Sequence, residues 1–502
     1  KAMTDFANDP ASEIEKLVRD VEARLVEIRR DIHAHPETGF DTVRTAAKVA
    51  EELRAIGLEP KTGVGRTGVV AEITGGAPGP CLILRADMDA LPIQEMTGLP
   101  YASTVAGKMH ACGHDLHTSA LLGAAHALKE MAPKLRGTVR LVFQPAEETL
   151  ESGAEAMIAD GAGDGADMAI AFHNRPELEA GKFRLNRGAG TASSDEFKVT
   201  IRGKSGHAAR PHAAVDPIVG AAHVITQLQT IISREMDPAQ SAVLTIGHIT
   251  GGETQNIIPD SCMFEGTARC RSPESRDRVE DSFRRICTNA AAAMNLEAEV
   301  EYMRGVPALI NDDAMVDRAA AALEAQFGIA PLVSEEPNFG AEDFSLFSER
   351  MPSIQIHVGA QTPGRDDRVH NSDYQPNESC IADSAIALTR EHMREDVKAA
   401  AHKAEEEAEA EVRSHTRCAR VVLTVVGVQA ERAEAEIVRE FLPKPMDSQE
   451  IEQAAQTVVS ELDASGLKDM GRVMGELKTR YAGRMDFSKA GAKVKTLLAG
   501  AA

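Results

Sequence analysis

The sequence predicts an α/β domain with a mixed sheet flanked by helices, into which a smaller α+β domain is inserted and after which an α-helical extension follows. Two observations support this fold class. Up to about residue 188, short apolar runs alternate with amphipathic helical segments, which is the pattern of a sheet covered by helices. After that point the order changes to strand, helix, two strands, helix and strand, the pattern of a compact α+β unit.

The length of 502 residues is too great for one hydrophobic core and favours about three domains. The alternation of apolar runs with helical segments returns after the small α+β unit, and beyond residue 390 the chain becomes charged and helical. We therefore expect a first domain formed by residues 10–188 and 305–395, an inserted domain of residues 189–304, a charged helical linker of residues 396–430 and a helical domain of residues 431–502.

Individual elements follow from apolar periodicity and from Gly and Pro at the boundaries. In the first domain we expect helices over residues 12–56, 118–131 and 153–161, and strands over residues 68–73, 80–92, 137–148, 168–174 and 353–359. In the inserted domain we expect strands over residues 193–209, 242–252, 262–272 and 297–305, and helices over residues 216–233 and 273–295. A β-like run, ARVVLTVVGV, follows the charged helix at residues 419–428.

Composition excludes several classes of protein. The formal net charge of −22 leaves no basic surplus for neutralising phosphates, which argues against binding to DNA or to an acidic membrane. No run of about 18 apolar residues predicts a membrane span, and the first residues contain no apolar segment typical of a signal peptide. Seven scattered cysteines without paired spacing fit a reducing cytoplasm, where we expect the protein to be located.

Two motifs match patterns of known functional sites, but the residues around them do not support those functions. GVGRTG at residues 63–68 matches the G-x-G-x-x-G pattern of dinucleotide sites, but a polar segment precedes it and a strand-like segment follows it, so we expect a hairpin turn. Ser205 and His207 in KSGH suggest a serine nucleophile, yet no G-x-S-x-G elbow accompanies them.

A group of metal-ligand residue types gathers around MHACGHDLH at residues 109–117. In an extended segment Cys112 and His114 point to the same face, but C-x-H alone is a weak signal, and a histidine-rich turn with a buried cysteine is the alternative. That alternative weakens because ligand residue types also stand at or after three other predicted strands; these are Glu147 and Glu148, His173, and His370.

The chain resembles the M20 metallopeptidases, and within them the aminoacylase and amidohydrolase branch that includes hippurate hydrolases and auxin-conjugate hydrolases. The resemblance covers about residues 12–395, roughly three quarters of the chain. It is carried, in order, by RRDIHAHPETGF, LRADMDALPIQE, MHACGHDLHTSALLG, VFQPAEE, GKSGHAARPH, NIIPD, NFGAEDFS and VHNSDYQ.

The resemblance implies two divalent metal ions, zinc or manganese, with cobalt or nickel also compatible with the ligand set. The residues that it implies as metal ligands are Cys112, His114, Glu148, His173 and His370, with Cys112 shared between the ions. Glu147 is then implied as the general base, which takes a proton from the attacking water and delivers it to the leaving amine.

The resemblance also implies that the inserted domain acts as a lid and holds a homodimer together. His207 would stabilise the tetrahedral intermediate, reaching into the site of the partner subunit, and Asn256 and Arg269 would contact the oxyanion or the substrate carboxylate. From the residues alone, Asn256 also fits a turn and Arg269 a surface strand position, so both interpretations stay open.

The expected reaction is hydrolysis of the amide of N-acyl amino acids, hippurate-like substrates among them. One alternative is a dipeptidase or carboxypeptidase of the same fold; against it, the chain reads Arg85-Ala-Asp87 where peptidase branches carry a His-x-Asp pair. Another is a non-catalytic adaptor. Residues from about 431 onward, with FLPK and KDMGRVMGELK, resemble the helical tail shared by YqeY-like proteins and the GatB subunit of tRNA-dependent amidotransferases, although the acidic surroundings argue against nucleic-acid binding.

Overall fold

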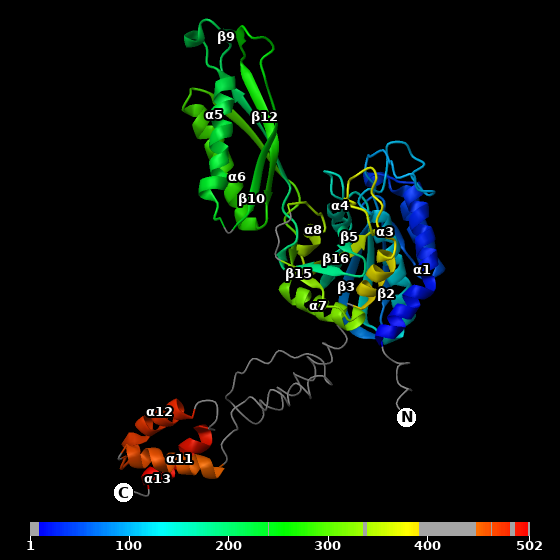
Figure 1. Ribbon diagram of the computed structural model, residues 1–502. Helices are drawn as coiled ribbons and strands as arrows, with labels where there is room; N and C mark the ends of the chain where they lie inside the picture. The colour runs from blue at the N-terminus through cyan, green and yellow to red at the C-terminus, as the bar shows by residue number, and fades with distance from the viewer. Residues whose placement is uncertain are drawn as a thin grey trace. The chain divides into compact units, whose positions relative to one another are not determined.

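The computed structural model describes residues 10–238, 240–334, 339–390, 448–462, 464–481 and 487–499. The chain divides into two compact units, Lys1–Ala399 and Ala400–Ala502 (Figure 1). The helical linker predicted for residues 396–430, with its β-like run at 419–428, lies outside the described residues.

A mixed eight-stranded sheet forms the centre of the first domain, in the order β1-β2-β4-β3-β5-β16-β6-β15. Strands β3, β4, β5 and β16 run parallel. Strands β1 and β2 pair antiparallel with their neighbours, and β6 pairs antiparallel with β16 but parallel with β15. The strands are β1 (Lys61–Val64), β2 (Gly68–Thr74), β3 (Ala77–Asp87), β4 (Arg136–Gln144), β5 (Met168–Glu179), β6 (Phe183–Asn186), β15 (Leu332–Ser334) and β16 (Ser353–Gln361). The predicted mixed sheet is confirmed.

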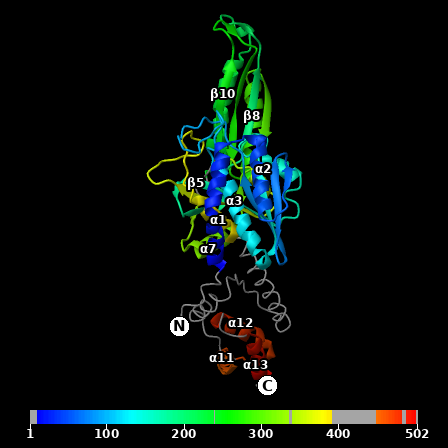
Figure 2. The same cartoon turned by 90° about the vertical axis from the view of Figure 1, so that its right-hand side faces the viewer.

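Helices cover both faces of this sheet, because alternate residues of its strands are apolar on opposite sides. On one face Leu84 and Ile170 belong to the core formed with α1 (Pro10–Ala34), α2 (Val43–Ala55), α3 (His114–Met131) and α7 (Asp313–Phe327). On the other face Ile83 and Ala169 pack with α4 (Gly153–Ala159) and α8 (Ser345–Ser348). Figure 2 shows α1 and α3 side by side over the sheet.

The GVGRTG segment is the turn of a β-hairpin, as predicted. Strands β1 and β2 pair antiparallel on either side of it, with Lys61 opposite Val70. Arg66 within the turn has a φ of 74°, which is the left-handed conformation of a tight turn.

The inserted segment forms an antiparallel four-stranded sheet in the order β10-β12-β8-β13, backed by two helices. Its elements are β8 (Asp195–Arg202), α5 (Pro217–Thr230), β10 (Ala242–Gly251), β12 (Ser261–Cys270), α6 (Pro273–Ala292) and β13 (Glu297–Arg304). It has a hydrophobic core of its own, which includes Phe197, Phe264 and Phe283. The inserted α+β fold is confirmed, while the boundaries of residues 189–304 stay a prediction.

Short strands mark the ends of this insertion. Two-residue strands β7 (Gly188–Ala189) and β14 (Ile310–Asn311) pair where the chain leaves and re-enters the first domain. Another pair, β9 (Gly206–His207) and β11 (Ile257–Ile258), joins two loops of the inserted domain, which Figure 1 shows at its upper end.

The second unit is helical in its described part. Helices α11 (Ser448–Glu461), α12 (Met470–Arg480) and α13 (Phe487–Ala499) surround a core that includes Ile451, Val473 and Val494. The predicted helical C-terminal extension is confirmed. None of the described helices is long and apolar enough to cross a membrane. The cytoplasmic location stays a prediction.

Candidate metal centre

Ligand-type side chains meet at the carboxyl end of the parallel strands, where α/β folds place their sites. Cys112 and His114 flank Gly113 at the start of α3, and His173 lies within β5. Gly113 has a φ of 91°, and a Cβ on it would lie 2.3 Å from the Nδ2 atom of Asn174. Only glycine therefore allows the chain to turn between these two side chains and still pack against β5.

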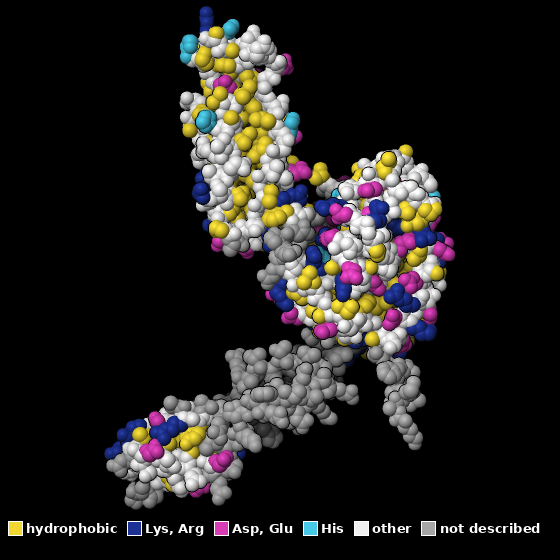
Figure 3. Space-filling model, in the orientation of Figure 1, with side chains coloured by type: hydrophobic (Ala, Val, Ile, Leu, Met, Phe, Trp, Pro, Cys, Tyr) yellow, Lys and Arg dark blue, Asp and Glu magenta, His cyan; other side chains and the backbone are white. Residues whose placement is uncertain are grey.

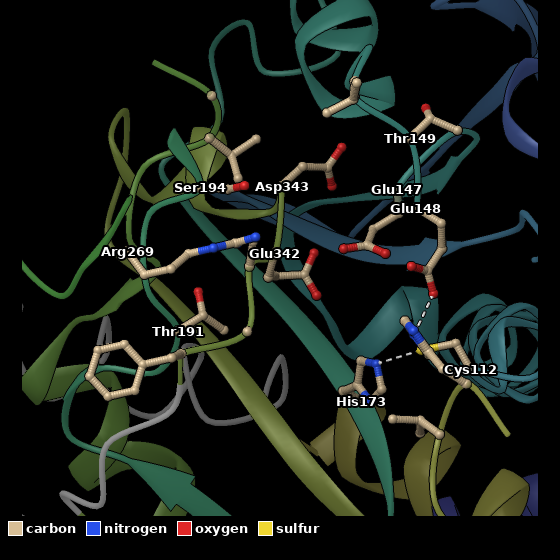
Figure 4. Close-up of a pocket in the computed structure, with 18 of the residues that line it drawn as sticks. Cys112, Glu147, Glu148, Thr149, His173, Thr191, Ser194, Arg269, Glu342 and Asp343 are labelled. Carbon is tan, nitrogen blue, oxygen red and sulfur yellow. Dashed lines mark hydrogen bonds and ion pairs between the residues drawn. The ribbon is translucent and has the colours of Figure 1, made fainter. Parts of the chain in front are cut away.

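All five residues predicted as metal ligands come together. The Sγ atom of Cys112 lies 3.4 Å from Nε2 of His173, and Oε1 of Glu148 lies 3.0 Å from Nε2 of His370 (Figure 4). Nε2 of His114 lies 3.9 Å from carboxylate oxygens of both Glu147 and Glu148. The donor atoms form overlapping sets of three within 4.8 Å of one another; these sets are Cys112–His114–His173, Cys112–Glu148–His370 and His114–Glu147–Glu148.

The chemistry of this cluster fits divalent ions. Imidazole, thiolate and carboxylate are the ligands that zinc and similar metals prefer. Both ring nitrogens of His114 are buried and make no hydrogen bond of normal geometry to the described residues. Buried polar atoms are normally hydrogen-bonded, so these unpaired nitrogens are available to bind a ligand such as a metal ion.

Two positions near these ligands have unusual backbone conformations. Ala146, directly before Glu147, has a φ of 52°, and His370 has a φ of 64°. Non-glycine residues rarely adopt such angles, and they concentrate at functional sites. Here they turn the side chains of Glu147 and His370 toward the cluster.

Excess negative charge shapes the protonation of the cluster. Burial, reinforced by the carboxylates of Glu342 and Glu148, raises the pKa of Glu147 well above its usual value. Burial also raises the pKa of the Cys112 thiol, and Glu148 adds to the effect. For His114, burial opposes the charged form, but the carboxylates, Asp87 first, outweigh it and raise its pKa to about 10. A cation would relieve this repulsion.

A second layer of hydrogen bonds holds the candidate ligands in place. Nδ1 of His173 lies 2.7 Å from the backbone oxygen of Asn174, which leaves Nε2 directed at Cys112. The amide of Asn174 donates to the backbone oxygen of Cys112 at 2.7 Å, and the hydroxyl of buried Tyr374 donates to the amide oxygen of Asn174. Such outer contacts fix ring orientation at metal sites.

Two carboxylates support this arrangement without lining the cavity described below. Asp89 accepts hydrogen bonds from the backbone N–H groups of Glu147 at 3.0 Å and of Glu148 at 3.1 Å. Asp87 lies 2.6 Å from Nδ1 of His117. The other ring nitrogen of His117 accepts from Asn174, so His117 is fully used by the protein and is a structural residue.

Sequence reasoning missed a buried charge network beside Glu147. Arg85, which is 0% exposed, donates to Asp87 at 2.7 Å and to Asp343 at 2.8 Å, and its guanidinium lies 3.1 Å from Glu342. Oxygens of Glu147, Glu342 and Asp343 lie within 4.8 Å of one another. The motifs LRADMDALP and NFGAEDFS contain the network residues Arg85, Asp87, Glu342 and Asp343, and were the available signal.

The cluster opens into a cavity of about 800 Å³. Cys112, Glu147, Glu148, His173 and His370 line it, and Arg269 of β12 extends into it from the inserted domain (Figure 4).

His207 and Asn256 are not among the residues that line this cavity. They are exposed and lie together at the β9–β11 pair, where the N–H of Ala208 donates to the backbone oxygen of Asn256 at 3.0 Å.

Known proteins resemble this chain over the same region. Residues 83–390 match Peptidase family M20/M25/M40, and residues 424–498 match the family described as Yqey-like protein. The N-acetyl-L-cysteine deacetylase of Bacillus subtilis (strain 168) is 45% identical over 340 residues, which is 68% of this chain and 81% of that protein. Thermostable carboxypeptidase 1 of Saccharolobus solfataricus is 38% identical over 354 residues, 69% of this chain and 89% of that protein.

A solved structure has the same fold. The Bacillus subtilis YXEP protein, described as a dinuclear metal binding peptidase from the M20 family, superposes with a TM-score of 0.67 and 34% identity. The superposition covers 75% of this chain and 98% of that protein.

Proposed function

Because this chain belongs to the peptidase family M20/M25/M40, we propose that it hydrolyses the amide bond of N-acyl amino acids and releases a carboxylic acid and a free amino acid. Small acyl groups such as acetyl and larger ones as in hippurate are both candidate substrates. The observation that carries the proposal is the carboxyl group of Glu147, which lines the cavity beside the candidate ligands with a raised pKa.

Two divalent ions, zinc or manganese with cobalt or nickel as alternatives, would be held by the five clustered ligands. Cys112 belongs to two of the three-donor sets, one with His114 and His173 and one with Glu148 and His370. This double membership supports its proposed role as the shared ligand. When bound, such ions supply Lewis acidity, which polarises an amide carbonyl and makes water more acidic.

Glu147 is proposed to move the proton. Its carboxylate takes a proton from the attacking water, holds it, and delivers it to the amide nitrogen as the carbon–nitrogen bond breaks. A carboxyl group whose pKa is raised by burial and by neighbouring carboxylates holds a proton more readily than an exposed one, which suits it to keep the proton between the two transfers. Glu148, whose pKa is lowered despite its burial because His370 and His114 lie beside it, is suited to stay ionised as a ligand.

Arg269 is proposed to bind the carboxylate of the amino-acid part. It lines the cavity, and within the part of the chain that the structure describes no carboxylate lies within ion-pair distance of its guanidinium. An arginine fork can bind both oxygens of a carboxylate.

His207 and Asn256 are proposed to act from a second copy of the chain in a homodimer. Strand β10 is an edge of the inserted sheet, and exposed Ile218, Val219 and Ile249 lie on or near it. Figure 3 shows hydrophobic side chains gathered along this face of the inserted domain, with histidines toward its end. An exposed edge strand beside apolar side chains favours pairing with another copy, which would carry His207 to the partner's cavity.

A carboxypeptidase is the second candidate, because a relative 38% identical to this chain bears that name. Both reactions cleave an amide next to a free carboxylate, so the same site can support either. Release of amino acids from N-acetyl and N-benzoyl amino acids, compared with release from matched dipeptides, separates the two candidates.

The test of the mechanism is Glu147→Gln in protein reloaded with Zn²⁺ or Mn²⁺. The substitution keeps the shape of the side chain and removes its ability to accept the proton, so kcat should fall on the order of 10²–10⁴-fold with metal content unchanged. Glu151→Gln is the matched control, because Glu151 is exposed and pairs with Arg66 outside the cluster. Full turnover by the Glu147 variant would exclude it as the base.

A further inference from the structure

Besides Arg269 of the inserted domain, the cavity is lined by Arg175, which belongs to the central sheet of the first domain. Arg175 lies on β5 two residues after His173, so both side chains leave the same face of the strand. The separation along the strand is roughly 6–7 Å. A group bound by Arg175 would therefore lie a few bonds away from an amide held at the candidate metal cluster.

Basic and donor side chains surround Arg175. Across the sheet, His357 of β16 lies opposite both His173 of β5 and Arg184 of β6. The guanidinium of Arg175 donates to Nε2 of His357 at 2.9 Å. On β16 the partner of Arg175 is Gly359, which has no side chain to separate Arg175 from His357.

Two of these nitrogens are unsatisfied. His357 is 4% exposed, and its Nδ1 atom has no hydrogen-bond partner among the described residues. Nε of Arg184 is likewise buried without a partner. No carboxylate of the described chain lies within ion-pair distance of Arg175 or Arg184, and the nearby Glu177 is exposed. Neither guanidinium is therefore neutralised by a direct ion pair with a described carboxylate, and Glu177 and Glu342 act on Arg175 only through longer-range attraction.

Gln355 lines the cavity farther along the sheet, opposite Ala171 of β5, and its amide nitrogen donates to Glu342 at 2.7 Å. A third arginine that lines the cavity, Arg304, is by contrast paired with Asp277 at 2.7 Å and with Glu280 at 2.6 Å. Of the three arginines that line the cavity, Arg175 and Arg269 therefore form no ion pair with a carboxylate of the described residues.

We propose that Arg175, backed by His357 and Arg184, forms a second anion subsite, and that the substrates are N-acyl amino acids with a carboxylate besides the α-carboxylate. The inference rests on the proposed amidohydrolase function for its reaction and on the Arg175 cluster for its substrate class. The second carboxylate belongs either to the acyl group or to the amino-acid side chain. A guanidinium free of protein carboxylates would bind it through charge-assisted hydrogen bonds.

The experiment compares kcat/KM within two pairs of substrates that differ in one negative charge. N-succinyl-L-methionine against N-butanoyl-L-methionine tests the acyl source, and N-acetyl-L-glutamate against N-acetyl-L-glutamine tests the side-chain source. In one of the pairs, the acid should be preferred on the order of tenfold or more, since hydrogen bonds to charged groups carry that much discrimination. Arg175→Met should reduce that preference to about one, and Arg304→Met should leave it as in the wild type.

A preference near one in both pairs for the wild-type protein would overturn the proposal, and so would an unchanged preference in Arg175→Met. A binding measurement separates this result from failure of the proposed function. Glutarate, compared with butyrate, should raise the melting temperature of the wild-type protein and not of Arg175→Met. If glutarate acts in this way while no N-acyl amino acid is cleaved with any metal, the anion subsite stands and the amidohydrolase function falls.

Discussion

Replacement of Arg85 by methionine should destabilise the first domain more than any single surface change. Arg85 is 0% exposed and donates to Gln144 at 2.9 Å, to Asp87 at 2.7 Å and to Asp343 at 2.8 Å, with Glu342 at 3.1 Å. Methionine fills much of the same volume but leaves three carboxylates in the interior without their cation. Breaking a buried ion pair in this way costs about 3–5 kcal/mol of the free energy of unfolding.

This cost can be read as a melting temperature by calorimetry. At about 2–4 °C per kcal/mol for a domain of 150–250 residues, the transition of the first domain should fall by roughly 6–20 °C. Arg66→Met is the control, because Arg66 pairs with Glu151 on the surface, where both side chains are more than half exposed and a pair contributes about 0–1 kcal/mol. A shift of Arg85→Met no larger than that of Arg66→Met would refute the role assigned to the buried network.

Three further predictions concern the metal cluster. Tyr374→Phe leaves the buried amide oxygen of Asn174 without its donor, so calorimetry should show a free energy of unfolding lower by about 1–3 kcal/mol. Metal affinity, measured by competition with a chromophoric chelator, should fall roughly 10–100-fold. Unchanged affinity would show that Asn174 does not orient the ligands. Gly113→Ala forces a left-handed backbone and a clash with Asn174, costing about 1–3 kcal/mol; elemental analysis should find less bound metal, and full occupancy would contradict the account of the turn. Removal of metal with a chelator should lower the melting temperature of the first domain, because a ligand at 100 times its Kd stabilises the folded state by about 2.7 kcal/mol. Readdition of Zn²⁺ or Mn²⁺ should restore the melting temperature. A melting curve that responds to neither treatment would argue against a metal site.

The predicted fold class rested on periodicity, and periodicity was sufficient because long apolar runs such as β16 (SIQIHVGAQ) are buried on both faces. The short strands were not predictable in the same way. Strand β6 (FRLN) and strand β15 (LVS) have too few residues to show a period, and their pairing depends on β16 lying between β5 and β6. Tertiary context decides such strands.

For the site, strand ends predicted the residues that meet because the carboxyl ends of parallel strands share one edge. The strand ends singled out these residues as ligand types, whereas the roles of the five ligand candidates and of Glu147 came from the family resemblance. The sequence did not indicate Arg175, because an arginine after a strand looks like any exposed arginine until its lack of a carboxylate partner is seen. The place of His207 outside the cavity of its own chain was anticipated only through the family resemblance, because the residues alone do not show how the inserted domain is arranged in space.

The hydrogen bonds that Asp89 accepts from two consecutive N–H groups have a mechanical consequence. One carboxylate holds the backbone of both Glu147 and Glu148, whose side chains then lie in different directions, that of Glu147 toward Glu342 and that of Glu148 toward His370. A displacement of this loop would therefore move the proposed base and a proposed metal ligand together. Asp89, which does not line the cavity, thus links the backbone positions of two residues that do.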